Sequence, residues 1–154
     1  MTDYDLLSKQ LESLAGDPGE GGRWWVSLLS NAAAVVYSGL ERINWAGFYL
    51  VREDELLLGP FQGKSACMRI PKGRGVCGTA FMLGRTLVVP DVTEFPGHIA
   101  CDPASRSEIV VPVFADGKVA GVLDIDSPEK ERFSADDREG LERLAATLEK
   151  LIEW

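Results

Sequence analysis

The sequence predicts an α+β fold, in which an antiparallel sheet is covered on one face by helices from both ends of the chain. Apolar residues recur at helical spacing in the first 40 residues and again after residue 134. Between them, short apolar runs alternate with polar turns, which favours hairpins. The length of 154 residues suits a single domain, 1–154. Within it we expect N-terminal helices in 1–40, the sheet and active-site loops in 43–126, and a C-terminal helix in 134–153.

The net charge and the absence of long apolar runs indicate which partners and which location to expect. A net charge of -8 at pH 7 disfavours binding to nucleic acid through phosphates and attraction to anionic lipid. The N-terminus lacks a basic segment followed by an apolar run, and no apolar run approaches the length of a bilayer span. We therefore expect a cytoplasmic protein that binds neither nucleic acid nor membrane. Thiols stay reduced there, so a disulfide among the three cysteines is expected to be transient and functional.

The N-terminal part predicts two helices, over residues 2–15 and 23–38, joined by a glycine-rich loop. Each helix carries one apolar stripe at helical spacing. The stripes consist of Leu6, Leu7, Leu11 and Leu14 in the first helix, and of Trp25, Leu28, Leu29, Ala32, Ala33 and Val36 in the second. Both stripes are expected to face the core.

A first hairpin is predicted from residue 43, where an apolar strand over 43–51 is followed by a polar turn and a second apolar run. Trp45, Gly47 and Tyr49 share one face of the first strand, while Phe48 and its alternate neighbours share the other. The Phe48 face suits a core. The glycine between the two rings leaves room for a small group, and ordinary aromatic packing is the alternative interpretation.

The middle of the chain predicts a short strand over 66–70, a glycine-rich turn and a short helix over 76–83. Backbone N–H groups at the start of that helix could hold a small carboxylate. The glycine spacing matches neither the P-loop nor the dinucleotide-binding fingerprint, so a plain turn into a helix is an equally adequate interpretation.

A loop after Pro96-Gly97 holds His98, the sole histidine, and Cys101 three positions later. A thiolate is the reactive form of cysteine, and a nearby imidazole or helix N-terminus favours it. Our hypothesis is therefore that Cys101 is a nucleophile. A half-buried structural cysteine is the alternative, because free cysteine is among the most buried residue types.

A second hairpin is predicted over 108–126, with an Asp-Gly turn between its two apolar strands. Alternation places Asp124 and Asp126 on one face of the second strand, and exposure of both to solvent is the alternative. The helix that follows begins at Ser134, a favourable N-cap with acidic residues in the first turn.

Three groups of side chains could meet on the sheet face away from the helices: Trp45 and Tyr49; Glu108, Asp124 and Asp126; and Cys67, Cys77 and Cys101. Crowded acids raise one another's pKa, and a protonated carboxyl can donate a proton to an oxygen. With a thiolate and an aromatic slot, this set suits attack by sulfur on a polarised S=O centre, followed by resolution with a second thiol. A zinc site of His98 with the three cysteines is the alternative, although no C-x-x-C pair is present.

Several segments in this order are similar to motifs of the free methionine-(R)-sulfoxide reductase family, a catalytic branch of the GAF domain fold. They are NWAGFY at 44–49, GPFQG at 59–63, GRGVCGTA at 73–80, VPDV at 89–92, FPGHIACD at 95–102, SEIVVP at 107–112 and VLDIDS at 122–127. The resemblance extends from about residue 43 to 128. It implies a single GAF-like domain and reduction of free L-methionine (R)-S-oxide to L-methionine, a repair of oxidative damage.

The resemblance also implies the roles of residues and partners. Cys101 corresponds to the nucleophile, Cys67 to the resolving cysteine and Cys77 to a third cysteine of the cycle. The acids Glu108, Asp124 and Asp126 correspond to residues that bind and polarise the sulfoxide, and Trp45 and Tyr49 to an aromatic wall. Thioredoxin is the implied electron donor, with no bound cofactor or metal, and a homodimer is the implied assembly. The competing hypothesis is a non-catalytic GAF module that senses a small ligand or redox state.

Overall fold

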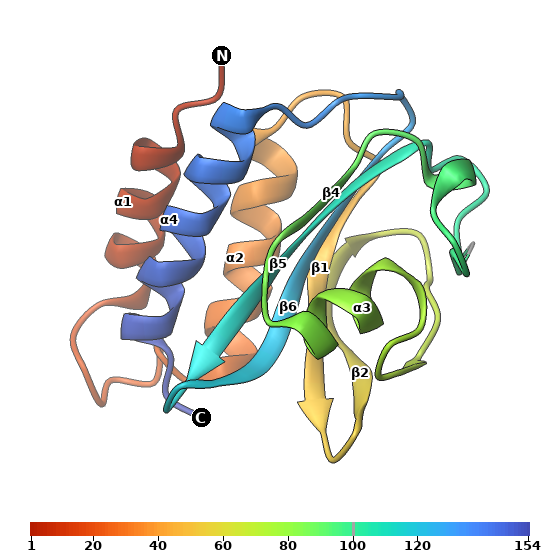
Figure 1. Cartoon of the computed structure of the whole chain (residues 1–154). Helices are drawn as coiled ribbons and strands as arrows, with labels where there is room; N and C mark the ends of the chain where they lie inside the picture. Colours follow the sequence, from red (N-terminus) through yellow and green to blue (C-terminus); the bar gives the residue numbers. More distant parts are fainter. Residues whose placement is uncertain (100) are drawn as a thin grey trace.

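The computed structural model describes residues 1–99 and 101–154, so Ala100 of the FPGHIACD motif lies outside the described residues. Four α-helices and six strands follow one another in the order predicted (Figure 1). The helices are α1 (Tyr4–Ala15), α2 (Trp25–Gly39), α3 (Gly75–Leu83) and α4 (Ala135–Leu151), with a short 3-10 turn at Val92–Glu94. The strands are β1 (Trp45–Arg52), β2 (Glu55–Gly63), β3 (Arg69–Pro71), β4 (Leu87–Val89), β5 (Ser107–Ala115) and β6 (Lys118–Ser127).

The strands form one sheet in the order β3-β2-β1-β6-β5-β4, with every neighbouring pair antiparallel. The first and second hairpins therefore meet at the centre of the sheet, where β1 pairs with β6. Helices α1, α2 and α4 cover one face, and α3 lies on the other (Figure 1). This arrangement confirms the α+β prediction, with terminal helices on a single face of an antiparallel sheet.

Alternation along the central strands divides the interior into two cores. Phe48 and Leu123 point toward the three helices, whereas Trp45, Tyr49 and Val122 point toward α3. The predicted faces of β1 and β6 are thus confirmed. Because the second core is covered only by a short helix and loops, polar side chains on that face can reach a cavity.

Local signals also hold at the element ends. Ser134 caps α4: its hydroxyl accepts a hydrogen bond from the Asp137 backbone N–H, and its own backbone N–H donates one to the Asp137 carboxylate. Gly16 follows α1 with a φ of 66°, a conformation that favours glycine. Within residues 1–99 and 101–154, none of the helices combines the length and apolarity required to cross a membrane.

The strand predicted over 66–70 is displaced, because β3 contains only Arg69–Pro71. The backbone before it is used differently: the carbonyl of Cys67 accepts a hydrogen bond from the Tyr49 hydroxyl at 2.8 Å. The Tyr49 side chain, and not a neighbouring strand, is therefore the hydrogen-bond partner of the Cys67 carbonyl. Cys67 lies in the loop between β2 and β3.

Candidate active site

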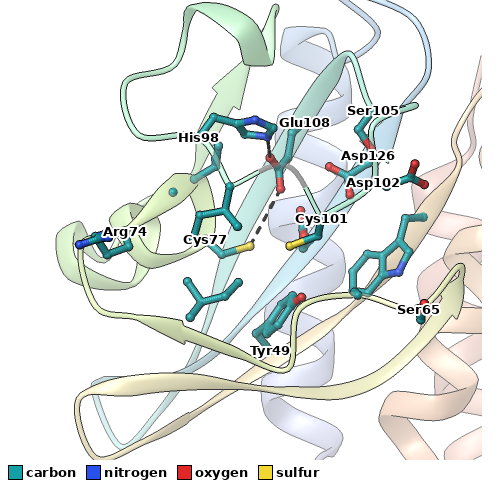
Figure 2. A pocket seen from close by; sticks show the side chains of 17 residues that line it. Tyr49, Ser65, Arg74, Cys77, His98, Cys101, Asp102, Ser105, Glu108 and Asp126 are labelled. Atoms are coloured by element: carbon teal, nitrogen blue, oxygen red, sulfur yellow. Dashed lines mark hydrogen bonds and ion pairs between the residues drawn. The ribbon is translucent and has the colours of Figure 1, made fainter.

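A cavity of about 40 Å³ lies on the sheet face that carries α3 (Figure 2). Its walls come from β1, β5 and β6, the start of α3, and the loop that contains His98 and Cys101. Strand alternation delivers the side chains of the central strands, and the loops close the cavity from above. Most residues that the sequence singled out therefore lie around one small space.

The three acids meet because β5 and β6 are paired in register. Glu108 stands opposite Asp126, and Asp124 stands opposite Val110, two residues along the same face of β5. Glu108 and Asp124 are each only 6% exposed, so the alternative of solvated carboxylates is wrong for Asp124. Burial raises the pKa of all three carboxyls, and the charges of the other two raise the pKa of Glu108 further. The cluster therefore retains protons that ordinary carboxyls release.

One oxygen of this cluster has no partner among the described residues. Asp124 Oδ1 is fully buried and makes no hydrogen bond there. A buried acceptor without a partner costs free energy, and such atoms in native proteins commonly serve a ligand. The cluster is therefore able to bind a polar group that enters the cavity.

Cys77 and His98 both contact Glu108. The Cys77 sulfur lies 4.0 Å from Glu108 Oε2, and His98 Nε2 lies 3.9 Å from Oε1 (Figure 2). Burial and the nearby Asp124 charge raise the pKa of the Cys77 thiol well above its usual range, so it stays protonated and a poor nucleophile. Burial lowers the pKa of His98, against the attraction of Asp124, and this favours the neutral imidazole. The sequence analysis considered His98 only as a neighbour of Cys101. The structure shows that the His98 ring also contacts Glu108.

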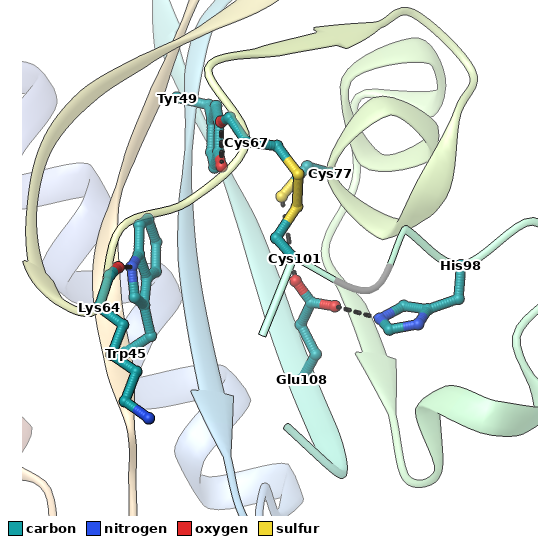
Figure 3. Close-up of a disulfide and its surroundings, with 8 residues drawn as sticks. All are labelled: Trp45, Tyr49, Lys64, Cys67, Cys77, His98, Cys101 and Glu108. Carbon is teal, nitrogen blue, oxygen red and sulfur yellow. Dashed lines mark hydrogen bonds and ion pairs between the residues drawn. A yellow bond between two sulfur atoms is a disulfide. The ribbon is translucent and has the colours of Figure 1, made fainter. Parts of the chain in front are cut away.

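A disulfide joins Cys67 and Cys101, whose Cα atoms lie 5.7 Å apart (Figure 3). Cys101 lines the cavity, whereas Cys67 belongs to the β2–β3 loop. In this state the zinc set of His98 and three cysteines is not available, because two of its sulfurs are bonded to each other. A cation could instead be held by Cys77, Glu108 and Asp124, whose ligand atoms lie within 4.8 Å of one another.

The aromatic residues anchor the loop that carries Cys67. Trp45 Nε1 donates a hydrogen bond to the Lys64 carbonyl at 3.0 Å, and the Tyr49 hydroxyl donates to the Cys67 carbonyl (Figure 3). Burial and the surrounding negative charges raise the pKa of Tyr49, so its hydroxyl remains a donor. Both rings line the cavity, with centroids 6.0 Å apart.

The space left by Gly47 is filled differently from the expectation. A Cβ at this position would contact the Phe61 side chain and lie 2.8 Å from Trp45 Cη2. Trp45 and Phe61 also stack, with centroids 5.3 Å apart. Protein therefore occupies the space above the glycine, which confirms the interpretation of this face as aromatic packing and excludes a ligand there. Trp45 and Tyr49 line the cavity with their remaining surface.

Asn44 is a site residue that the sequence interpretation missed. Its side-chain amide donates hydrogen bonds to Asp102 Oδ2 and Ser105 Oγ, each at 3.1 Å. These bonds attach the loop after Cys101 to the start of β1. The available signal was adjacency, since Asn44 precedes Trp45 and Asp102 follows Cys101.

The glycine-rich turn reaches the cavity as well. Arg74 and Gly75, at the start of α3, are both among its lining residues. Gly75 has a φ of 63°, and a Cβ there would meet the Ile99 side chain at 3.1 Å. Glycine is therefore required both by the backbone and by the close approach of the Cys101 loop.

Comparisons with known proteins agree with this geometry. The GAF domain family model matches residues 27–153. The free methionine-R-sulfoxide reductase of Escherichia coli is 53% identical over 128 residues, covering 83% of this chain and 78% of that protein. The Saccharomyces cerevisiae protein of the same name is 50% identical over 154 residues, covering 95% and 85%.

Solved structures of free methionine-R-sulfoxide reductases are also similar to this chain. The reduced form of fRMsr from Staphylococcus aureus superposes with a TM-score of 0.92 at 51% identity, covering 99% of this chain and 97% of that one. Free methionine-R-sulfoxide reductase from Neisseria meningitidis, in complex with its substrate, gives 0.88 at 50% identity, covering 96% and 86%. The similarity therefore extends over nearly the whole chain.

Proposed function

We infer that this chain, which belongs to the free methionine-R-sulfoxide reductase family of GAF domains, reduces free L-methionine (R)-S-oxide to L-methionine. One observation carries the proposal beyond family membership. The disulfide of Cys67 and Cys101 adjoins a cavity lined by Glu108, Asp124 and Asp126, whose pKa values are all raised. Thiol and proton donor are the two groups that sulfoxide reduction needs.

The proposed reaction starts with Cys101 as nucleophile. Its thiolate bonds to the sulfoxide sulfur while a protonated carboxyl of Glu108, Asp124 or Asp126 gives a proton to the sulfoxide oxygen. The hydroxyl group then moves from the substrate sulfur to Cys101 Sγ as the bond between the two sulfurs breaks, so methionine is released and Cys101 becomes a sulfenic acid. Cys67 then attacks this sulfur, forming the disulfide and releasing water. The raised pKa values support the role of the acids as proton donors.

Cys77 fits a supporting role in this scheme. Its thiol is buried, remains protonated and contacts Glu108. These features favour Cys101 as the sulfur that attacks. We assign Cys77 to the wall of the acid cluster, where it can also serve as a third thiol of the cycle.

Selectivity for the free amino acid is assigned to groups that hold its ammonium and its carboxylate, the latter at the start of α3. A site that holds both groups excludes a substrate in which they continue into a peptide chain. The backbone N–H groups near Gly75, together with Arg74, are suited to hold the substrate carboxylate. Trp45 and Tyr49 are assigned to the apolar side of the substrate.

Thioredoxin as electron donor, a homodimeric assembly and a cytoplasmic location complete the proposal. The chemistry supports a dithiol donor, because the resting product of each cycle is a disulfide that a second dithiol can exchange with. Electrons pass from the donor's dithiol to the enzyme disulfide and from Cys101 to the sulfoxide sulfur, so the proposed cycle requires no bound cofactor.

The deciding assay measures methionine formed from the (R) and (S) epimers separately, with thioredoxin and its reductase as the electron source. Wild type is compared with Cys101→Ser, with Cys77→Ser as the matched control. We expect turnover of the (R) epimer alone, abolished in Cys101→Ser and retained in Cys77→Ser. A folded, fully reduced protein that produces no methionine would instead support a ligand-binding GAF module.

A further inference from the structure

The segment that carries Cys67 differs in charge from the rest of the chain. Residues 56–90 contain five basic residues and no acidic residue, although the whole chain has a net charge of -8. The basic residues are Lys64, Arg69, Lys72, Arg74 and Arg85. Lys64 and Lys72 are exposed, and Arg69 forms an ion pair with Glu55 at 2.7 Å. Cys67 therefore lies in a positively charged segment of an acidic protein, whereas Cys101 lies beside the acid cluster.

An exposed apolar side chain adjoins the same cysteine. Met68 follows Cys67 directly and is 75% exposed. Isolated apolar residues are common on protein surfaces, but methionine beside a half-buried reactive cysteine provides an adaptable contact for a protein partner. We call the exposed residues Lys64, Ser65, Met68 and Lys72, together with Cys67, the Cys67 surface.

The two sulfurs of the disulfide have different surroundings. Cys101 lines the cavity with Glu108 and Cys77, whereas Cys67 follows Ser65 and Ala66, which also line the cavity, and is not itself a lining residue. Cys67 comes from the β2–β3 loop, which also carries Lys64 (Figure 3). Both cysteines are half-buried, and on the Cys67 side the exposed Met68 and Lys64 offer a protein partner a surface outside the cavity.

We propose that the Cys67 surface is the docking site of the dithiol protein that reduces the enzyme, and that the partner's thiolate attacks the sulfur of Cys67. This inference rests on the proposed function and adds the surface, the attacked atom and the chemistry of the partner. The fitting partner has an apolar rim and negative charge around its two cysteines, complementary to Met68 and Lys64.

The exchange is balanced in two steps. The partner's thiolate bonds to Cys67 Sγ, the Cys67–Cys101 bond breaks, and its electron pair leaves on Cys101 as a thiolate. The second thiol of the partner then attacks its own sulfur in the mixed disulfide, which releases Cys67 as a thiol after protonation. The partner is oxidised to a disulfide and the two enzyme cysteines are reduced. Cys101 is thereby returned to the cavity in its nucleophilic form.

The test separates docking from chemistry by changing the reductant. Turnover of methionine (R)-sulfoxide is measured with thioredoxin as the varied substrate and, separately, with dithiothreitol. In Met68→Asp we expect kcat/KM for thioredoxin to fall about tenfold, and in Lys64→Glu several-fold with a weaker salt dependence. Turnover with dithiothreitol should stay within about twofold of wild type, because a small reductant needs no docking surface.

Matched controls come from α1, which lies on the opposite side of the sheet (Figure 1). Leu6 is 51% exposed and Lys9 is exposed, so Leu6→Asp and Lys9→Glu make the same changes away from the disulfide. Both are expected to leave the thioredoxin kinetics unchanged. Equal losses in Met68→Asp and Leu6→Asp would contradict the assigned surface.

The attacked sulfur is identified by trapping. Thioredoxin that lacks its second cysteine is mixed with the oxidised enzyme, and the mixed disulfide is digested with trypsin. We expect it on the peptide 65–69, which contains Cys67, and not on 86–106, which contains Cys101. A mixed disulfide on Cys101 would overturn the proposal. Wild type that fails to turn over with dithiothreitol would instead refute the reductase function, while the trapping result stays interpretable.

Discussion

Replacing Glu108 with glutamine is expected to weaken catalysis and to stabilise the fold at alkaline pH. Glutamine keeps the shape of the side chain but carries neither a charge nor a transferable proton. Reactive atoms of Glu108 and Asp124 lie within 4.8 Å. Two carboxylates at that separation repel each other by about 3 kcal/mol at an effective dielectric constant of about 20. Burial and the Asp126 charge also raise the pKa of Glu108, so this value gives the order of magnitude of the stabilisation that removing one charge brings.

The sign of the pH dependence follows from the raised pKa of Glu108. Between its unfolded and folded pKa values, the folded protein binds protons that the unfolded chain has released. The free energy of unfolding therefore falls as pH rises through this window. Glu108→Gln removes this loss, so its advantage is near zero in acid and grows toward about 3 kcal/mol in alkali. For a chain of this size, a stabilisation of about 3 kcal/mol corresponds to a rise in Tm of roughly 6–12 °C.

Urea unfolding of the oxidised protein at about pH 5, 7 and 9 measures this effect. Glu12→Gln, at an exposed position of α1, is the matched control and should show no such trend. In the methionine assay, kcat should fall by about 100-fold or more if Glu108 is the carboxyl that donates the proton. A Glu108→Gln protein that is destabilised equally at each pH would refute the self-repelling cluster, and one that keeps the wild-type kcat would exclude Glu108 as the donor and leave Asp124 and Asp126.

Three further substitutions test other parts of the site and fold. Tyr49→Phe removes the hydrogen bond to the Cys67 carbonyl. It should lower the free energy of unfolding by about 1–3 kcal/mol, which urea unfolding measures. It should also slow formation of the Cys67–Cys101 disulfide, which thiol titration measures. Cys77→Ser should still form the Cys67–Cys101 disulfide, which mass mapping of the oxidised protein checks. Asp137→Asn breaks the buried pair with Arg132 at 3.0 Å and should destabilise by about 3–5 kcal/mol. Burial alone would raise the pKa of Asp137, but hydrogen bonds from Ser134 and Tyr4 and the Arg132 charge lower it overall. The ionised carboxylate therefore stabilises the folded wild type above the unfolded pKa of Asp137. This stabilisation, and with it the difference from Asp137→Asn, is lost as pH falls through the pKa of Asp137 in the folded protein.

Local patterns were sufficient to predict the elements and the faces of the strands. Alternation in β1 and β6 separated Phe48 and Leu123, which face the helices, from Tyr49 and Asp124, which face the cavity. The Asp-Gly turn predicted the second hairpin, whereas the register that brings Glu108 opposite Asp126 also requires an irregularity between Val113 and Phe114. These features depend on residues close in sequence, so the chain encodes them locally.

Features that depend on contacts across the sheet could not be obtained in this way. Phe61 fills the space above Gly47 because β2 pairs with β1 in a register that has an irregularity beyond Gly47. Asn44 reaches Asp102 across 58 positions of sequence. The displaced β3 has the same origin, since the Tyr49 hydroxyl competes for the backbone of Cys67. In each case a tertiary partner overrides a local pattern.

The cavity size orders the steps of the proposed cycle. In the disulfide state about 40 Å³ is free, which suffices for a few water molecules but not for an amino acid. The Cys67–Cys101 bond also holds the β2–β3 loop against the loop that closes the cavity. We therefore expect methionine to leave before the disulfide forms, and the next sulfoxide to bind after the disulfide is reduced. Reduction by a partner at Cys67 would then free the two loops as well as restore the Cys101 thiolate, so that substrate binds to enzyme that is able to react.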